Sequence, residues 1–183
     1  MHMEIEVLRI GQRVVRDDRV TTHVALVARS FGAHKIYMNE VNSEIEKTIS
    51  DINKTWGGNF KIEIISEWKK IIKERKNAGV KIVHLTMYGQ NINNVEMKIR
   101  NEGKILIVVG AEKVPREIYE MADYNVAVGN QPHSEISALS VLLDRIYQGK
   151  QFESDFDNPE RVIIPQEHGK NVVTNKTTVN NGK

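Results

Sequence analysis

Residues 126–139 read VAVGNQPHSEISAL and pass within a few positions from a small apolar strand into a helix. Val126 and Val128 are β-branched, as is typical of a buried strand, and Ser134 is a favoured residue at a helix N-terminus. Between them lies the stiff, amide-rich corner GNQPH at 129–133. A strand that leads through a glycine corner directly into a helix is typical of the parallel sheets of α/β proteins. The stretch therefore predicts the fold class and raises the question of what its corner binds.

The rest of the chain repeats this alternation of strand and helix. Apolar runs of strand length, several rich in Ile and Val, lie at Ile5–Ile10, Lys35–Met38, Phe60–Ile65, Val80–Leu85, Ile105–Val109 and Asn125–Val128. Helical patterns lie at Val20–Ser30, Ser43–Trp56, Glu67–Lys76, Asn94–Arg100, Pro115–Met121 and Ser134–Tyr147. This alternation predicts a mostly parallel six-stranded sheet with helices on both faces.

The domain organisation follows from the length of 183 residues and from a change in composition near the C-terminus. We expect one domain over residues 1–165 and a polar tail over 166–183, which carries little that could form a core and is predicted to be disordered. In the last predicted helix, Leu139 and Leu143 lie on one face while Val141 and Leu142 are apolar on another. This apolar arc is too wide for one surface layer, so the helix lies either deep in its own chain or against a second copy.

Composition excludes several classes of protein. The chain is 40% hydrophobic and 27% charged, and it has no apolar run long enough to cross a membrane. Because it contains no cysteine, disulfides and thiolate metal sites are excluded. The start, MHMEIEVLRI, lacks the features of a secretory signal, so we expect a cytoplasmic protein. A formal net charge of +2 leaves open whether the partner is a nucleic acid.

The glycines that directly follow strands lie in the second half of the chain, at Gly89, Gly110 and Gly129. Ligands of open parallel sheets bind beyond the carboxyl ends of strands, so the candidate site lies in this half. The first strand instead leads into IGQRVVRDDR, which lacks the glycine spacing of a dinucleotide or phosphate loop and disfavours a dehydrogenase. The corners at Gly110 and Gly129, stiffened by Pro115 and Pro132, suit the edge of a heterocycle such as adenine better than a phosphate. Plain tight turns with a helix cap remain the alternative.

Two long blocks carry a family resemblance. Residues 105–146, ILIVVGAEKVPREIYEMADYNVAVGNQPHSEISALSVLLDRI, and residues 10–33, IGQRVVRDDRVTTHVALVARSFGA, closely resemble the archaeal tRNA ribose 2′-O-methyltransferases of the SPOUT superfamily. The resemblance covers Ile5 to Pro165. It implies a C-terminal trefoil knot, S-adenosylmethionine as the methyl donor, the cytidine at position 56 in the TΨC loop of tRNA as the substrate, and a homodimer. A catalytically silent RNA-binding protein of the same knotted fold remains the alternative.

The resemblance also assigns roles to particular residues. By position, it places the cofactor pocket at Leu85, Gly110, Ala111, Glu112, Lys113, Val114, Val128, Gly129, Asn130, Gln131, Pro132, His133, Ser134 and Glu135. It places Arg29, on the first predicted helix, near the ribose and phosphate of the substrate as the catalytic residue. His23 stands where the superfamily often has asparagine, and we expect it to cap or pack. No metal site is expected, because no second histidine or carboxylate lies at ligand spacing from His133.

Two groups of basic residues are candidates for contact with RNA. The first lies before the first predicted helix and is interrupted by two aspartates; its members are Arg9, Arg13, Arg16 and Arg19. The second recurs at helical spacing; its members are Lys69, Lys70, Lys73 and Lys76. A solvated helix face explains the lysines as well as a phosphate track does. The arginines are favoured as RNA contacts, because a guanidinium binds phosphate oxygens in pairs.

Overall fold

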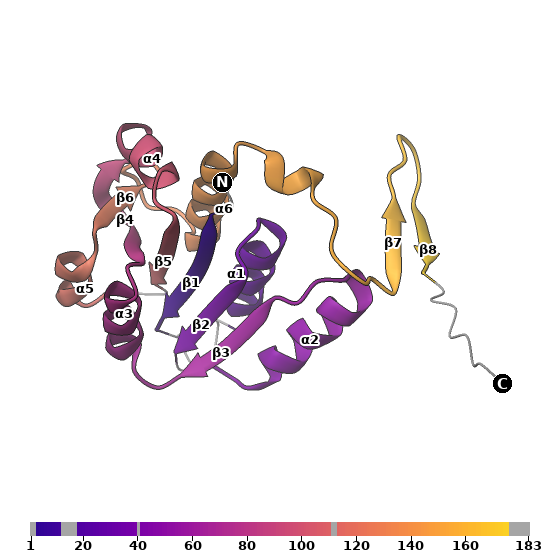
Figure 1. The fold of residues 1–183 in the computed structure, drawn as a ribbon, viewed down its shortest axis with the longest axis horizontal. Helices are drawn as coiled ribbons and strands as arrows, with labels where there is room; N and C mark the ends of the chain where they lie inside the picture. Colours follow the sequence, from indigo (N-terminus) through magenta and orange to yellow (C-terminus); the bar gives the residue numbers. More distant parts are fainter. Residues whose placement is uncertain (1–2, 12–17, 40, 111–112, 176–183) are drawn as a thin grey trace.

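The computed structural model of the chain describes residues 3–11, 18–39, 41–110 and 113–175. Within them the elements follow in the order β1 Glu4–Ile10, α1 Asp18–Ser30, β2 Lys35–Asn39, α2 Glu44–Trp56, β3 Lys61–Ile65, α3 Trp68–Asn77, β4 Lys81–Asn91, α4 Ile92–Arg100, β5 Lys104–Gly110, α5 Arg116–Met121, β6 Tyr124–Ala127, α6 Glu135–Tyr147, the 3₁₀-helix η1 Lys150–Glu153, β7 Arg161–Ile164 and β8 Asn171–Thr174 (Figure 1).

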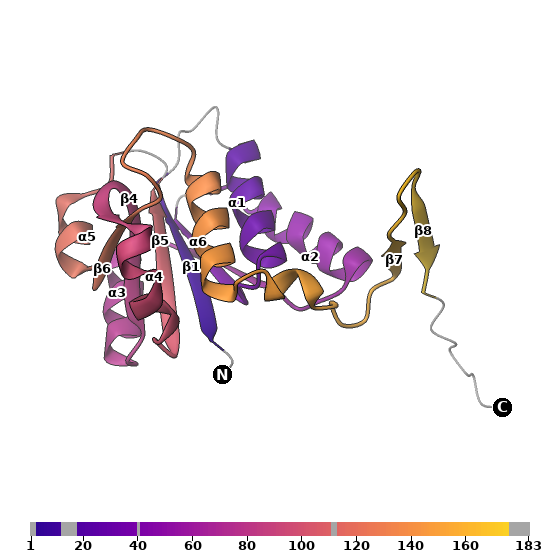
Figure 2. The same ribbon diagram turned by 90° about the horizontal axis from the view of Figure 1, so that it is seen from above.

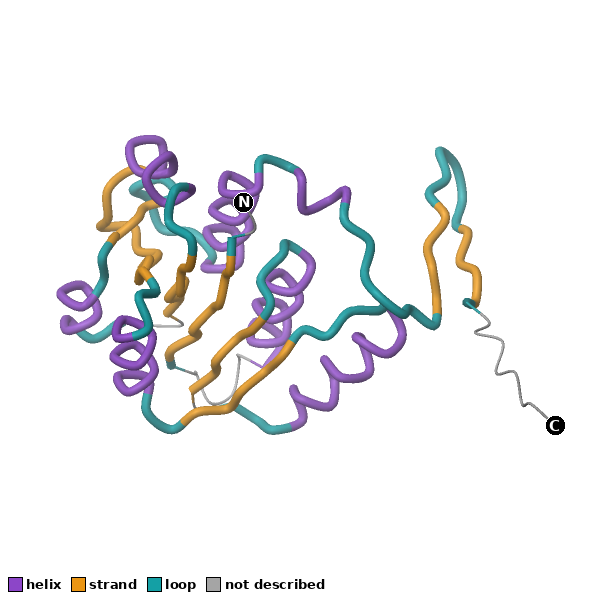
Figure 3. Tube along the Cα trace, in the orientation of Figure 1, coloured by secondary structure: helices purple, strands orange, loops and turns teal. Residues whose placement is uncertain are grey.

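The main sheet confirms the predicted fold class. In the described residues it has six strands in the order β3-β2-β1-β5-β4-β6, and every neighbouring pair is parallel. Figure 3 shows these strands between the helices that connect them. The central strands β1 and β5 are buried along almost their whole length, because both of their faces are covered. Their carboxyl ends meet where Ile10 pairs with Gly110.

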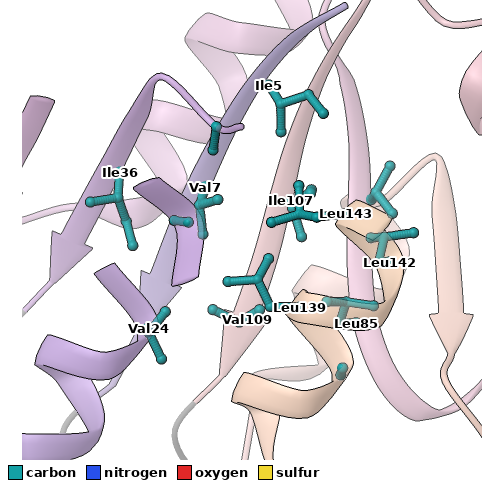
Figure 4. Close-up of a cluster of buried hydrophobic side chains, with 14 of the residues drawn as sticks. Ile5, Val7, Val24, Ile36, Leu85, Ile107, Val109, Leu139, Leu142 and Leu143 are labelled. Carbon is teal, nitrogen blue, oxygen red and sulfur yellow. The ribbon is translucent and has the colours of Figure 1, made fainter. Parts of the chain in front are cut away.

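Helices cover both faces of the sheet (Figure 2). The sheet separates the hydrophobic core into two layers. One layer packs α1, α2, α4 and α6 against the sheet, and the other packs α3 and α5 against the opposite face. In the first layer, side chains of the sheet such as Val7 and Ile107 lie beside Val24 of α1 and Leu139 and Leu143 of α6 (Figure 4). This burial of aliphatic side chains is the main term that stabilises the fold.

Helix α6 resolves the question raised by its wide apolar arc. The residues Ala138, Leu139, Leu142, Leu143 and Ile146 are all buried within the chain itself. The helix packs along α1 and also contacts α4, so its arc is covered by two helices and the sheet (Figure 2). The first of the two alternatives, a helix deep in its own chain, therefore accounts for most of the arc. The width of the arc alone no longer argues for a second copy.

Strand β4 is longer than the sequence predicts and crosses β6 in an unusual way. It was expected to end at Leu85 but runs on to Asn91, and its register on β6 shifts between Leu85 and Gln90. Both of these residues pair with Val126, so the four residues between them bulge around β6. The crossing is so close that a Cβ on Gly89 would lie 2.5 Å from the main chain of Asn125 and Val126. This path is compatible with the predicted trefoil knot.

The C-terminal segment forms a hairpin at the position of the predicted domain boundary. Residues 161–164 and 171–174 form the antiparallel hairpin of β7 and β8, so residue 165 lies between its two strands, while the division into a domain and a tail stays a prediction. Figures 1 and 2 both show this hairpin standing away from the main sheet beyond α2. The polar composition concealed two short strands, each containing adjacent β-branched residues. Residues 176–183 lie outside the described part of the chain.

Candidate functional site

A cavity of about 690 Å³ opens at the carboxyl ends of β4, β5 and β6. Its walls come from the bulge of β4, the end of β5 with the residues that follow it, Tyr119 of α5, and the corner between β6 and α6. This is the edge of a parallel sheet at which ligands bind, because strands end there and loops begin. The volume lies within the usual range of small-molecule sites, which is roughly 300 to 1,000 Å³.

Most of the residues assigned to the cofactor pocket line this cavity. They are Leu85, Gly110, Lys113, Val114, Val128, Gln131, Pro132, His133, Ser134 and Glu135. They come from three separate segments of the chain, which the crossing of β4 and β6 brings together. Ala111 and Glu112 lie outside the described residues. The assignment of these residues to a particular ligand stays a prediction, while their gathering around one cavity is observed.

Two predicted pocket residues, Gly129 and Asn130, do not line the cavity but shape its wall. Gly129 has a φ of 74°, in the left-handed region that favours glycine, and a Cβ there would meet open space. The amide of Asn130 donates from Nδ2 to the carbonyl oxygen of Met87 at 2.8 Å and to that of Gly89 at 3.1 Å. The amide-rich corner therefore fastens the β6–α6 connection to the bulge of β4.

The remainder of the corner starts helix α6. The hydroxyl oxygen of Ser134 accepts from the backbone N–H of Ile136 at 3.1 Å, as the sequence predicts for a helix cap. The imidazole of His133 donates from Nε2 to the carbonyl oxygen of Val128 at 2.6 Å. Among the described residues, no group of three or more histidine or acidic side chains is arranged to hold a metal ion. The side chain of His133 is hydrogen-bonded to the main chain at Val128, and this bond joins the two ends of the corner.

Sequence reasoning missed several residues of the cavity wall. The missed residues are His84, Thr86, Met87, Tyr88, Tyr119 and Ala138. The glycine of the stretch LTMYG at 85–89 marked this region, but a strand was expected to end there rather than to bulge and continue. Only the tertiary crossing turns the side chains of the bulge toward the cavity, so no local pattern identified them.

A buried polar network lies behind the cavity wall. Nδ1 of His84 lies 2.8 Å from the side-chain oxygen of Asn125, whose amide group donates to the backbone oxygen of Tyr119 at 2.9 Å. Since that oxygen accepts, Nδ1 of His84 carries the proton and Nε2 is an acceptor. Burial lowers the pKa of His84, while its hydrogen bond to Asn125 acts in the opposite direction. In the described part of the chain no hydrogen-bond partner reaches Nε2, so the wall holds an uncharged, unpaired acceptor.

Arg9 is placed beside the cavity and not on the surface. Its side chain is fully buried at the end of β1, and Nη1 donates to the carbonyl oxygen of Gly11 at 3.0 Å. Nη2 lies 3.9 Å from a carboxylate oxygen of Glu135, which lines the cavity in the first turn of α6. The prediction that Arg9 contacts RNA is therefore wrong, because no solvent-facing group is left to reach a phosphate. Its charge supports the carboxylate of Glu135 instead.

Arg29 is not brought to the cavity of its own chain. It lies in the last turn of α1, which runs back toward the amino ends of the strands. At that end of the sheet the backbone N–H of His34 donates to the carbonyl oxygen of Ile5 near the start of β1. The side chain is only 7% exposed. Nε donates to the side-chain oxygen of Asn53 at 2.9 Å and Nη2 to the carbonyl oxygen of Gly57, while the guanidinium lies 4.3 Å from the ring centre of Phe156. Its catalytic role stays a prediction, and these contacts favour a structural one.

The other basic residues expected to contact RNA lie either on the surface or outside the described part of the chain. Arg19 is exposed at the start of α1, whereas Arg13 and Arg16 lie outside the described part of the chain. Three of the lysines on α3 are in ion pairs, namely Lys69 with Glu117, Lys70 with Glu74 and Lys76 with Asp123. This pairing favours a solvated helix face over a phosphate track. His23 is exposed in the middle of α1, so the packing role expected for it is not observed.

Comparison with known proteins gives matches along most of the chain. The family model described as tRNA ribose 2′-O-methyltransferase, aTrm56, matches residues 56–173. A tRNA (cytidine(56)-2′-O)-methyltransferase of Nitrosopumilus maritimus is 65% identical over 175 residues, which cover 96% of this chain and 99% of the relative. The protein of the same name from Thermococcus kodakarensis is 53% identical over 94% of this chain and 98% of its own.

Solved structures show the same fold at low sequence identity. The TrmH/SpoU tRNA modifying enzyme of A. aeolicus superposes with a TM-score of 0.58 and 16% identity over 82% of this chain and 76% of its own. The SpoU methyltransferase AviRb of Streptomyces viridochromogenes, in complex with AdoMet, gives a TM-score of 0.58 and 10% identity over 81% of this chain. This chain spans 58% of that longer protein.

Proposed function

Because the chain belongs to the family of tRNA ribose 2′-O-methyltransferases known as aTrm56, we propose that it methylates the 2′-hydroxyl of cytidine 56 in the TΨC loop of tRNA. The observation that carries this proposal is the identity of 65% over nearly the whole length of both chains.

The proposed donor is S-adenosylmethionine, and the cavity fits it in chemistry and size. Leu85, Val114 and Val128 offer apolar walls for an adenine, and the corner of 131–134 offers main-chain groups for its polar edge. His84 lines the same cavity and its Nε2 has no hydrogen-bond partner among the described residues, which supports a ligand with a donor group at this wall. When bound, S-adenosylmethionine supplies a methyl group that is already activated as a sulfonium. We propose that the cavity residues predicted from the sequence hold it, with Gly129 and Asn130 shaping the wall.

The residues of the chain then have to place the acceptor and the donor in line and to remove a proton from the 2′-hydroxyl. Lys113 is exposed at the cavity and brings positive charge to the side where an RNA phosphate has to approach. Glu135, paired with the buried Arg9, is a carboxylate in the same wall. Of these two charged side chains of the described cavity wall, Lys113 is the one that attracts a polyanionic substrate.

Location and assembly are part of the same proposal. No helix in the described ranges is long and apolar enough to cross a membrane. A tRNA-modifying enzyme works where tRNA matures, which favours the cytoplasm. We also propose a homodimer, as the family resemblance implies. The apolar side chains Ile163 and Val173, which the hairpin of β7 and β8 leaves exposed, are surface that a second copy would cover.

The proposed reaction is tested with a methyl-labelled donor and two tRNA transcripts that differ in one atom. We expect the protein to label the unmodified transcript and to leave a transcript with 2′-deoxycytidine at position 56 at background, because the acceptor oxygen is missing. Equal labelling of both transcripts would place the methyl group elsewhere. Binding of donor and tRNA without labelling of either transcript would identify a catalytically silent RNA-binding protein.

A further inference from the structure

Tyr88 is an exposed aromatic residue at the rim of the cavity, and it has no role in the reaction proposed above. Its side chain is 74% exposed, whereas the other tyrosines are buried or half-buried. The hydroxyl groups of Tyr37, Tyr119, Tyr124 and Tyr147 each have a hydrogen-bond partner. Among the described residues none is recorded for the hydroxyl of Tyr88. It thus presents a free ring to the solvent at the mouth of the site.

The main chain that carries Tyr88 is held on both sides. The amide of Asn130 donates to the carbonyl oxygens of Met87 and Gly89, the residues directly before and after it. The backbone N–H of Tyr88 donates to the hydroxyl of Thr86 at 3.3 Å, and Gly89 packs directly against the main chain of β6. A ring on such a support loses little conformational entropy when a flat partner binds, in contrast to a ring on a mobile loop.

Tyr88 also lines a second hollow. Besides the cavity described above, it lines a hollow of about 420 Å³ whose lining also includes Gln90, Lys98 and Asp123. The negative charge of Asp123 is balanced by ion pairs with Lys76 and Lys81, while Lys98 is exposed. The second hollow therefore offers positive charge next to the ring, as a nucleotide with its base on the ring and its phosphate nearby requires.

Methyl transfer to a ribose inside a folded RNA loop requires that the nucleotide leave its stack. Proteins replace the lost stacking by placing an aromatic side chain against the base. The described part of the cavity is lined by two tyrosines, Tyr88 and Tyr119. The ring of Tyr119 is already in a T-shaped contact with the ring of His84, with the ring centres 4.7 Å apart, and its hydroxyl is hydrogen-bonded with Thr86. Tyr88 is the more exposed of the two, and no ring contact within the described residues occupies it.

We propose that Tyr88 stacks on the base of the target cytidine and positions its ribose over the cavity. This inference rests on the proposed methyl transfer and names a residue that binds the RNA and not the donor. Stacking of a base on an aromatic ring is worth about 1 to 2 orders of magnitude in affinity when the ring is removed. The hydroxyl group contributes nothing to it, so phenylalanine replaces tyrosine.

The test is steady-state methyl transfer to an unmodified tRNA transcript by the full-length protein and its variants. We expect Tyr88→Ala to raise KM for tRNA about tenfold or more, and Tyr88→Phe to stay within about twofold of the wild type. Donor affinity, measured by calorimetric titration, and molecular mass, measured by light scattering, should be unchanged in both variants. Met97→Ala is the control, because Met97 is another exposed apolar side chain, at 62%, that does not line the cavity.

If the wild-type protein transfers the methyl group, the proposed reaction is supported, and three results for the variants would still overturn the inference about Tyr88. If Tyr88→Ala keeps the KM of the wild type, the ring does not contact the substrate. If donor affinity falls in parallel with transfer, Tyr88 belongs to the donor site. If the molecular mass changes, the ring belongs to an interface between copies. Absence of transfer by the wild-type protein would instead contradict the proposed function itself.

Discussion

Gly89→Ala is expected to prevent the native structure from forming, or to lower the free energy of unfolding by more than about 4 kcal/mol. A Cβ on Gly89 would lie 2.5 Å from the carbonyl carbon and oxygen of Asn125 and from the nitrogen of Val126. These are main-chain atoms of β6, which is paired with β4 on both sides of the bulge, so neither strand can move away without breaking the sheet. Urea denaturation followed by circular dichroism measures the effect.

The matched control is Gly103→Ala. Gly103 precedes β5, has no positive φ recorded and would have no atom within 4 Å of an added Cβ. We expect its substitution to change the free energy of unfolding by less than about 1 kcal/mol, as is usual for open surface positions. A Gly89→Ala protein that unfolds at the same urea concentration as the wild type would mean that β4 and β6 do not cross as described.

Arg29→Ala is expected to lower the free energy of unfolding by about 2 to 4 kcal/mol, because it removes a buried cation together with its hydrogen bonds. The substitution leaves the side-chain oxygen of Asn53 and the carbonyl oxygen of Gly57 without their donor and uncovers the ring of Phe156. These contacts join α1 to α2 and to the segment after η1. Under conditions where the variant is folded, donor affinity and the rate of transfer should change no more than a few-fold.

The catalytic role implied by the family resemblance makes the opposite prediction for the same variant. Loss of a preorganised charge that acts on the transition state slows transfer by a factor on the order of one hundred or more and leaves stability unchanged. Single-turnover transfer and urea denaturation on one preparation separate the two roles. Arg116→Ala is the control, because the side chain of Arg116 is 91% exposed. A stable Arg29→Ala protein with a hundredfold slower transfer would restore the catalytic assignment.

The strands, the helices and the region of the site could be predicted because local patterns specify them. Runs of Ile and Val mark the buried strands, and Ser134 caps α6 as expected. The glycines at 110 and 129 lie where strands end beside the cavity. Each of these features depends on residues within a few positions of one another, which is the range that sequence patterns describe.

The features that could not be predicted depend on contacts between distant segments. The continuation of β4 past Leu85 requires β6 to pass against Gly89, and His84 becomes part of a network only when Asn125 arrives beside it. The positions of Arg9 and Arg29 follow from what packs against them. An arginine has the same sequence signal in an ion pair, in a buried contact or on a phosphate, so only the tertiary structure distinguishes these roles.

The cavity at the ends of β4, β5 and β6 is the feature on which donor binding, RNA placement and the role of Tyr88 all depend. A crystal structure of the protein with S-adenosylhomocysteine, the product of the donor, tests it most directly. We expect the adenine against Leu85, Val114 and Val128, within hydrogen-bond reach of the corner at 131–134, and the sulfur facing the side on which Tyr88 stands. Electron density for the ligand at any other place on the chain would contradict the assignment of this cavity as the methyl-donor site.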